Sequence, residues 1–167
     1  MKIESPQNRT QGLLEIKDLC FTEQVFVWAL RMKVRGDKFF QKVHLEFKDN
    51  LPPSAARVAI ESVNSVIQLV RNNGTKSIKL NCTCVPYLSP DEWLLVKFLR
   101  KINNDPGTPW PLSDADVIGK EGYDNFVHSL LAFQMALGCV DPQPSSGAMH
   151  RGNQMDQVHK EASVMIH

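Results

Sequence analysis

The chain has 167 residues, 43% of them apolar, so it is long enough to bury roughly two-thirds of the surface that the unfolded chain would expose. Its 19 basic and 18 acidic side chains give a formal net charge of +1, far from the basic excess of a dedicated nucleic-acid-binding protein. The composition therefore predicts one domain with a hydrophobic core and argues against a nucleic-acid partner.

Residues 1–19 are polar, apart from a small apolar group at Leu13, Leu14 and Ile16, and we expect them to form a flexible arm. No apolar run follows the first charges, so we expect no secretory signal. No segment reaches the run of about 18 apolar residues that a membrane-spanning helix needs. We therefore expect a cytoplasmic protein that does not enter a membrane.

A first helix is predicted over about residues 22–35, where Thr22 can cap the start and Gly36 can end the helix. Residues 25–30 are all apolar, which is too wide a block for a helix with one solvated face. Either most sides of this helix are buried or a partner covers it across a dimer interface. The candidate interface residues are Phe26, Trp28, Leu30, Arg31, Lys33 and Arg35.

The apolar residues of the segment 37–48 are compatible with the hydrophobic period of a helix and with that of a strand. Phe40, Val43 and Phe47 fall on one helical stripe, whereas Val43, Leu45 and Phe47 alternate as in a strand. We favour a helix. The long segment that follows Leu51 has a clean amphipathic helical pattern.

Asn73 and Gly74 end that long helix, and the pattern then changes. In residues 77–85, Ile78, Leu80 and Cys82 alternate with polar residues, which predicts a short extended connector. Cys84 has the same phase as Cys82, so we expect both thiols on one side, facing the core.

The four cysteines are Cys20, Cys82, Cys84 and Cys139, and we expect them to be reduced and to pack as small apolar side chains. One residue between Cys82 and Cys84 is fewer than structural zinc sites use, and no second pair occurs. The Cys-x-x-Cys spacing of redox pairs is also absent. We predict no metal site, no redox site and no cofactor.

Ser89-Pro90-Asp91-Glu92 has the form of a capping box and predicts a helix over about 90–103. After a proline-rich loop, a last helix is predicted from about Glu121 to Gly138.

Residues 141–167 are rich in Pro, Ser, Gly and Gln and should form a disordered tail. The predicted domain therefore spans residues 20–140. Its fold class is all-α, a bundle of four or five helices with flexible ends.

Catalysis needs a nucleophile beside a base, and the chain has no nucleophile elbow, zincin motif or phosphate-binding Gly-rich loop. His44 and His128 are the histidines inside the predicted helical domain. Asp124 precedes His128 by four residues and can contact it on the same helical face. Such pairs are common on helix surfaces, so we predict no catalytic residue.

The order of the last two helices, with a short turn between them, is compatible with a helix-turn-helix unit. A recognition helix needs basic or amide side chains that face the DNA. Residues 105–126 instead carry five acidic residues against Lys120 alone. DNA binding is therefore the alternative function and not the favoured one.

Charge is distributed unevenly along the chain, since residues 31–48 hold six basic and two acidic side chains while residues 105–126 are acidic. A basic side and an acidic side suit docking to another protein or head-to-tail self-association. We predict a non-enzymatic cytoplasmic protein with a regulatory role that acts through protein–protein interaction, with a homodimer as one form. The alternatives are a helix-turn-helix-like DNA-binding regulator and, below it, a small enzyme or metal-binding protein.

Overall fold

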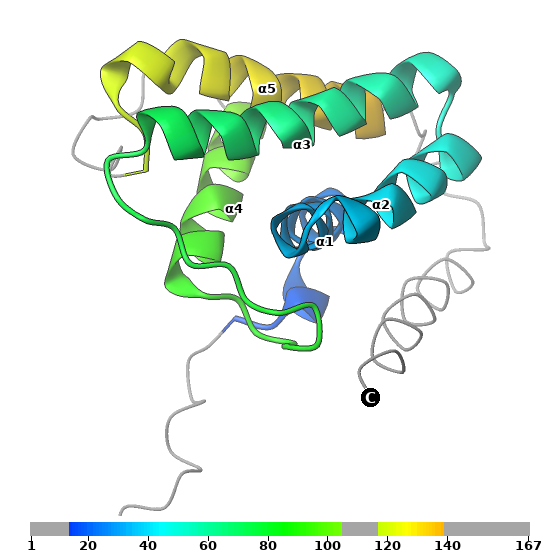
Figure 1. Cartoon of the computed structure of the whole chain (residues 1–167), viewed down its shortest axis with the longest axis horizontal. Helices are drawn as coiled ribbons and strands as arrows, with labels where there is room; N and C mark the ends of the chain where they lie inside the picture. The colour runs from blue at the N-terminus through cyan, green and yellow to red at the C-terminus, as the bar shows by residue number, and fades with distance from the viewer. Residues whose placement is uncertain (1–13, 105–116, 139–167) are drawn as a thin grey trace, which may run out of the picture.

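The structure is a computed structural model that describes residues 14–104 and 117–138 (Figure 1). In these two ranges it contains five α-helices and no β-strand, which confirms the predicted all-α class. None of these helices is long and apolar enough to cross a lipid bilayer. The helices are α1 (Phe21–Arg35), α2 (Asp37–Asn50), α3 (Pro53–Asn73), α4 (Pro90–Asn104) and α5 (Lys120–Gly138), and a short 3₁₀ helix, η2, spans Ile16–Asp18.

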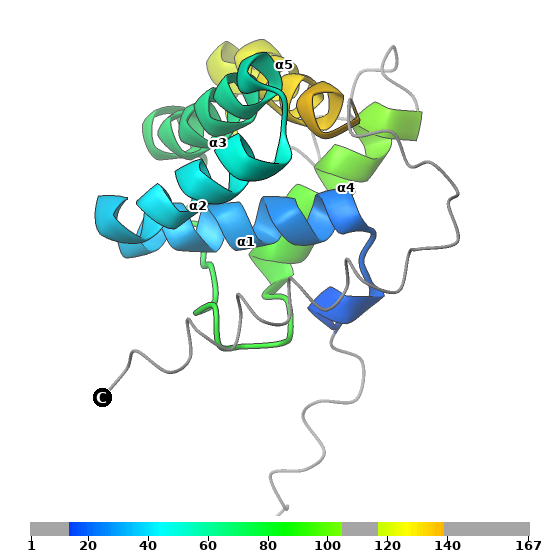
Figure 2. The ribbon, with the colours of Figure 1, turned by 90° about the vertical axis from the view of Figure 1, so that its right-hand side faces the viewer.

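The helices form two layers, with α3 and α5 side by side and antiparallel above α1 and α2 (Figures 1 and 2). α4 crosses α1 and reaches up to α5 on the remaining side. α1 contacts α2, α3 and α4, and residues 25–32 of this helix are all buried. Amphipathic helices arranged in this way share one main core, which is distinct from a smaller apolar cluster.

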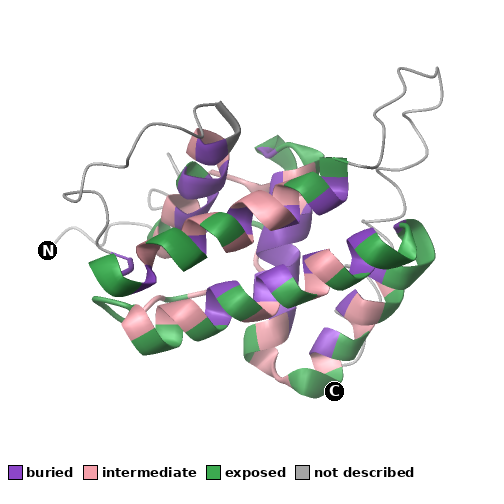
Figure 3. Ribbon diagram, turned by 90° about the horizontal axis from the view of Figure 1, so that it is seen from above, coloured by how far each residue is buried: buried purple, intermediate pink, exposed green. Residues whose placement is uncertain are grey.

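Aromatic rings from four helices meet in that core. The ring of Phe133 in α5 lies 5.2 Å from that of Phe26 in α1 and 6.4 Å from that of Phe47 in α2. In the same core, Phe98 of α4 meets Phe126 of α5 edge to face, with centroids 5.5 Å apart. Figure 3 shows buried and exposed residues alternating along the helices, as expected when each helix turns one face inward.

The first helix begins one residue earlier than predicted and is capped differently. Cys20, not Thr22, occupies the N-cap position, and its backbone N–H donates to Oε2 of Glu23 at 3.1 Å. Arg100 of α4 also donates to both carboxylate oxygens of Glu23, at 2.5 and 2.9 Å. Burial alone would raise the pKa of Glu23, but the hydrogen bonds from Arg100 and Cys20 lower it below the usual value.

Gly36 forms the whole connection between α1 and α2, with φ of 120° and ψ of 165°. Residues with a Cβ avoid this conformation, so glycine is needed at the corner. The α2 segment, for which two periods were possible, is a helix, and Phe40, Val43 and Phe47 are buried on one face. Leu45, which a strand would have placed beside them, is 60% exposed.

α3 and α5 are in close contact where α3 ends and α5 begins. The N–H of Gly119 donates to the carbonyl oxygen of Asn73 at 2.7 Å. A Cβ at Gly122 would lie 2.7 Å from the Cβ of Asn73, closer than two such atoms can come. Glycine at position 122 therefore permits this contact.

Residues 14–19, which the sequence assigned to a flexible arm, pack against the rest of the chain. Leu88 donates its N–H to the carbonyl of Leu14 at 3.0 Å, and Ile16 donates to the carbonyl of Pro86 at 2.8 Å. Leu19 is buried in a small apolar cluster under α1 and α4. Residues 14–19 are thus part of the fold, while the rest of the predicted arm and the predicted tail, residues 141–167, lie outside the described residues.

Candidate functional site

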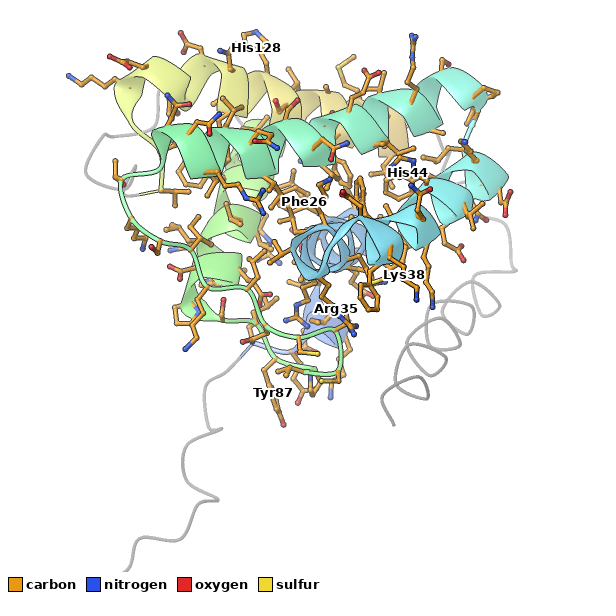
Figure 4. The ribbon with its side chains drawn as sticks, viewed as in Figure 1. Phe26, Arg35, Lys38, His44, Tyr87 and His128 are labelled. Atoms are coloured by element: carbon orange, nitrogen blue, oxygen red, sulfur yellow. The ribbon has the colours of Figure 1, made fainter. Side chains whose placement is uncertain are left out.

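The connection between α3 and α4, residues 74–89, is hereafter called the α3–α4 loop. It has no regular secondary structure and runs below α1, along the lower side of the molecule in Figure 1. Figure 4 shows Tyr87 at its outer edge, directed away from the helices, and Arg35 between the loop and α1. An exposed irregular segment of this length usually has several conformations, so what holds it in place decides what it can do.

Arg31 of α1 holds the loop from the inside and is only 2% exposed. Its Nε and Nη2 donate to the two carboxylate oxygens of Glu92, at 2.7 and 2.9 Å. Its Nη1 donates to the carbonyls of Cys82 at 3.1 Å and Val85 at 2.6 Å. Nη2 also donates to the carbonyl of Tyr87, at 2.8 Å. These contacts occupy all five N–H groups of the guanidinium.

Glu92, at the start of α4, binds the other side of the same loop. Its Oε2 accepts from the N–H of Ser89 at 2.7 Å, and the N–H of Glu92 donates to Oγ of Ser89 at 3.1 Å. This reciprocal pair is the predicted capping box. Its Oε1 also accepts from the N–H of Asn81 at 2.9 Å. The carboxylate therefore caps α4, neutralises Arg31 and binds the loop backbone.

A second carboxylate fixes the start of the loop. Asp91 accepts from the N–H of Lys79 at 2.9 Å and pairs with Nζ of Lys76 at 3.1 Å. Partial burial tends to raise the pKa of Asp91, but these contacts, first the Lys79 N–H and then Lys76, hold it below the usual value. The loop is thus bound at several points along its length.

The tip of the loop is a turn closed by a hydrogen bond from the N–H of Val85 to the carbonyl of Cys82, 3.0 Å long. Thr83 is buried, and its Oγ1 accepts from Nη1 of Arg35 at 2.9 Å. Cys82 and Cys84, on either side of Thr83, are both exposed. The prediction that this pair faces the core is therefore wrong, because the chain turns here and Thr83 takes the inward position.

Cys20 is exposed as well, so the packing role predicted for the cysteines fails for all three in the described ranges. Cys20 caps α1 at the opposite end from Arg35, which lies beside the loop. Cys139 lies outside the described residues. The exposed thiol pair at the loop tip is a feature that sequence spacing alone did not predict.

The two thiols of the tip affect each other's ionisation. Hydrogen bonding from the backbone N–H of Cys84, and next from the Cys84 thiol, lowers the pKa of Cys82, and the charge of Arg35 adds to this effect. The contact with Cys82 raises the pKa of Cys84. Cys82 is therefore the member of the pair that ionises first.

Known proteins give no guide to the role of this loop. No protein-family model, curated protein or solved structure matches the chain. The role of the loop must therefore be inferred from the chain's own residues.

The apolar residues predicted to form an interface lie inside the chain itself. Phe26 and Leu30 are at most 1% exposed and Trp28 is 6% exposed, because α2, α3 and α4 surround α1. Arg31 is equally inaccessible and is bound to Glu92. A dimer interface at these four positions would require the fold to open, so we correct the prediction: the wide apolar block reflects burial on most sides.

Lys33 and Arg35, the other two predicted interface residues, are only partly buried. Nζ of Lys33 pairs with Asp37 at 2.8 Å, in an ordinary helix-surface contact. The guanidinium of Arg35 lies over the ring of Phe39 at 4.1 Å and binds Thr83. Arg35 is thus the one residue of the predicted set that borders the α3–α4 loop on the surface.

His44 and His128, the two histidines that the structure describes, form no site with thiols or paired carboxylates of the described residues. Nδ1 of His128 lies 2.7 Å from the backbone oxygen of Asp124, and not at its carboxylate as predicted. His128 and Glu61 line an open groove of about 530 Å³ between α3 and α5, whose lining includes no cysteine. Burial, followed by the charges of nearby lysines, lowers the pKa of His44 on α2. No group of three potential metal ligands occurs within residues 14–104 and 117–138.

Of the two charged segments predicted from the sequence, the basic one, residues 31–48, lies wholly within the described residues. Arg35, Lys38, Lys42 and Lys48 form no ion pair with any residue that the structure describes. Most of the acidic segment, residues 105–116, lies outside the described ranges, although Glu121 and Asp124 are exposed on α5.

Sequence reasoning missed Glu92 and Thr83 as partners of the two arginines. A signal for Arg31 was present, because a charged residue beside six apolar ones in a helix buried on most sides must find a buried counter-charge. No local pattern identified Glu92 as that partner, since 61 positions separate the two residues.

Proposed function

We propose that this chain is a non-enzymatic cytoplasmic protein that binds an acidic segment of another protein through the α3–α4 loop and the adjoining ends of α1 and α2. The observation that carries the proposal is the commitment of every N–H group of the buried Arg31 to an irregular surface loop and its anchor, Glu92. Exposed thiols at Cys20, Cys82 and Cys84 suit a reducing compartment.

Stability alone does not explain the Arg31–Glu92 pair. Buried ion pairs cost desolvation energy, and apolar residues of similar size often stabilise a fold equally well or better. What apolar side chains at these positions could not do is bind three loop carbonyls and two loop N–H groups. A loop fixed in advance loses little conformational entropy when a partner binds, so this arrangement favours recognition.

The charges around the loop favour an acidic partner. Lys79 in the loop and Lys38 at the start of α2 are exposed, and no described carboxylate lies within ion-pair distance of either. Arg35, which binds Thr83 at the tip of the loop, adds a third positive charge (Figure 4). Complementary charge steers association and sets orientation. Tyr87 and the exposed Pro86 supply apolar contact area at the same edge.

The test needs a partner identified from cell extract with the full chain as bait, followed by measurement of the dissociation constant. Lys38→Glu combined with Lys79→Glu should weaken binding by about tenfold or more, because both charges then repel an acidic segment. The matched control is Arg57→Glu combined with Lys97→Glu, which makes the same charge change at exposed positions on α3 and α4. Equal affinities for the two double variants would overturn the proposal.

Duplex DNA is the second ligand in this test, because it represents the alternative function. α5, the predicted recognition helix, packs along α3 and exposes Glu121 and Asp124, which would repel phosphates. Arg31 is also unavailable for phosphate contact. Salt-sensitive DNA binding that the Lys38 and Lys79 charge reversals abolish would replace the protein-binding proposal.

A further inference from the structure

We infer that Cys82 and Cys84 form a redox-active dithiol site that reacts reversibly with low-molecular-weight disulfides, such as glutathione disulfide. This inference goes beyond the proposed function and does not depend on it. It rests on the position of both thiols at the tip of a fixed turn, where they are exposed to solvent and next to each other.

The turn supplies the geometry that the Cys-x-Cys spacing by itself lacks. In an extended segment, the Cα atoms of residues i and i+2 are too far apart for an unstrained disulfide. A turn closed by the hydrogen bond from Val85 to Cys82 brings the Cα atoms of Cys82 and Cys84 closer together. Thr83 occupies the inward position and Arg35 holds it there, which leaves Cys82 and Cys84 outside. The fold therefore pairs the thiols before any reaction takes place.

The two thiols have different chemical roles. Reactive, redox-sensing cysteines are exposed, ionise easily and lie next to a second thiol. Cys82 is exposed and lies next to Cys84, and the N–H and thiol of Cys84 and the charge of Arg35 lower its pKa. Cys84, whose pKa is raised, ionises after Cys82 and serves as the resolving thiol. A Cys-x-x-Cys motif at a helix start would give a similar division of roles by other means.

The reaction is thiol–disulfide exchange in two balanced steps. The Cys82 thiolate attacks one sulfur of glutathione disulfide, which breaks that S–S bond, forms a Cys82–glutathione mixed disulfide and releases one glutathione thiolate. The Cys84 thiol then gives its proton to solvent and attacks Sγ of Cys82, which releases the second glutathione thiolate. Two cysteine thiols are oxidised to one disulfide, and one glutathione disulfide is reduced to two glutathione molecules.

The disulfide should be easy to reduce again. The carbonyl of Cys82 is bound by Arg31 and by Val85, and Thr83 is bound by Arg35, so the turn cannot relax freely around a small ring. Exposed or strained disulfides are the labile and regulatory ones, whereas structural disulfides resist reduction. A reversible site is consistent with the surface position of the loop.

The test treats the folded full-length chain with glutathione disulfide, blocks remaining thiols with N-ethylmaleimide and digests the chain with trypsin. Cys82 and Cys84 fall in one tryptic peptide, residues 80–97, while Cys20 and Cys139 fall in two others. We expect that peptide to lose two hydrogens and gain no label, and dithiothreitol to restore both labelling sites. A peptide that stays fully labelled, or carries only glutathione, would overturn the inference.

Two variants separate the roles of the thiols, with Cys20→Ser as the control that should change nothing. Cys84→Ser should trap the glutathione adduct on Cys82. Cys82→Ser should form the mixed disulfide about threefold more slowly than Cys84→Ser, since Cys82 keeps in Cys84→Ser the hydrogen bond from the N–H of residue 84 that lowers its pKa. Circular dichroism confirms that each variant is folded. Equal rates of mixed-disulfide formation in the two variants would overturn the division of roles. Formation of the Cys82–Cys84 disulfide in the unmodified chain at the same rate in urea would overturn the role of the turn.

Discussion

At the scale of single residues, Arg31 is the side chain on which the described loop most depends. Its guanidinium binds Glu92 and the carbonyls of Cys82, Val85 and Tyr87. Part of this was predictable from sequence, because the block of apolar neighbours indicated that α1 is buried on most sides. The partners of Arg31 were not predictable, since Arg31 and Glu92 connect α1 with the start of α4 through contacts that no local sequence period encodes.

Replacing Arg31→Met should destabilise the chain by roughly 3–5 kcal/mol, because Glu92 would remain buried without its counter-charge. Urea denaturation followed by circular dichroism measures this change. The comparison is Asp37→Asn, which breaks the exposed pair with Lys33 and should leave the denaturation midpoint almost unchanged. If both variants lost an equally small amount of unfolding free energy, the Arg31–Glu92 pair would not be buried in solution.

At the scale of elements, the helices were largely predictable and the loop was not. Helix ends depend on residues within one turn, as Ser89 and Glu92 show for α4 and Gly36 shows for α1. The period of Phe40, Val43 and Phe47 was enough to favour a helix for α2. The inward position of Thr83 depends on Arg35, 48 positions away, and alternation along the connector therefore gave the wrong direction for both thiols.

Gly36→Ala should destabilise the chain by about 1–3 kcal/mol, because a Cβ disfavours a φ of +120° combined with a ψ near 165°. A Cβ there would meet no atom within 4 Å, so the cost comes from the backbone alone. Gly138→Ala is the matched control: its Cβ would also have free space, and its φ is not positive. Thermal unfolding of both variants measures the difference. Equal unfolding temperatures would mean that α1 and α2 do not meet at this corner.

At the scale of the whole molecule, the sequence predicted the class of fold but not which surface is free. The apolar block of α1 allowed either a core helix or a dimer interface, and only the placement of α2, α3 and α4 around it decides for the core. The surface proposed here for recognition is formed instead by the α3–α4 loop. That surface exists only if the contacts of Arg31 and Glu92 hold the loop in one conformation without a partner.

Hydrogen–deuterium exchange of the isolated full-length chain, resolved to single amides by NMR, tests this claim most directly. The N–H groups of Asn81 and Ser89, which donate to Glu92, and that of Val85, which closes the turn, should exchange slowly. In Arg31→Met they should exchange much faster, while core amides of α3 stay protected. Fast exchange at these three amides in the unmodified chain, with α3 protected, would mean that Arg31 and Glu92 do not hold the loop in one conformation.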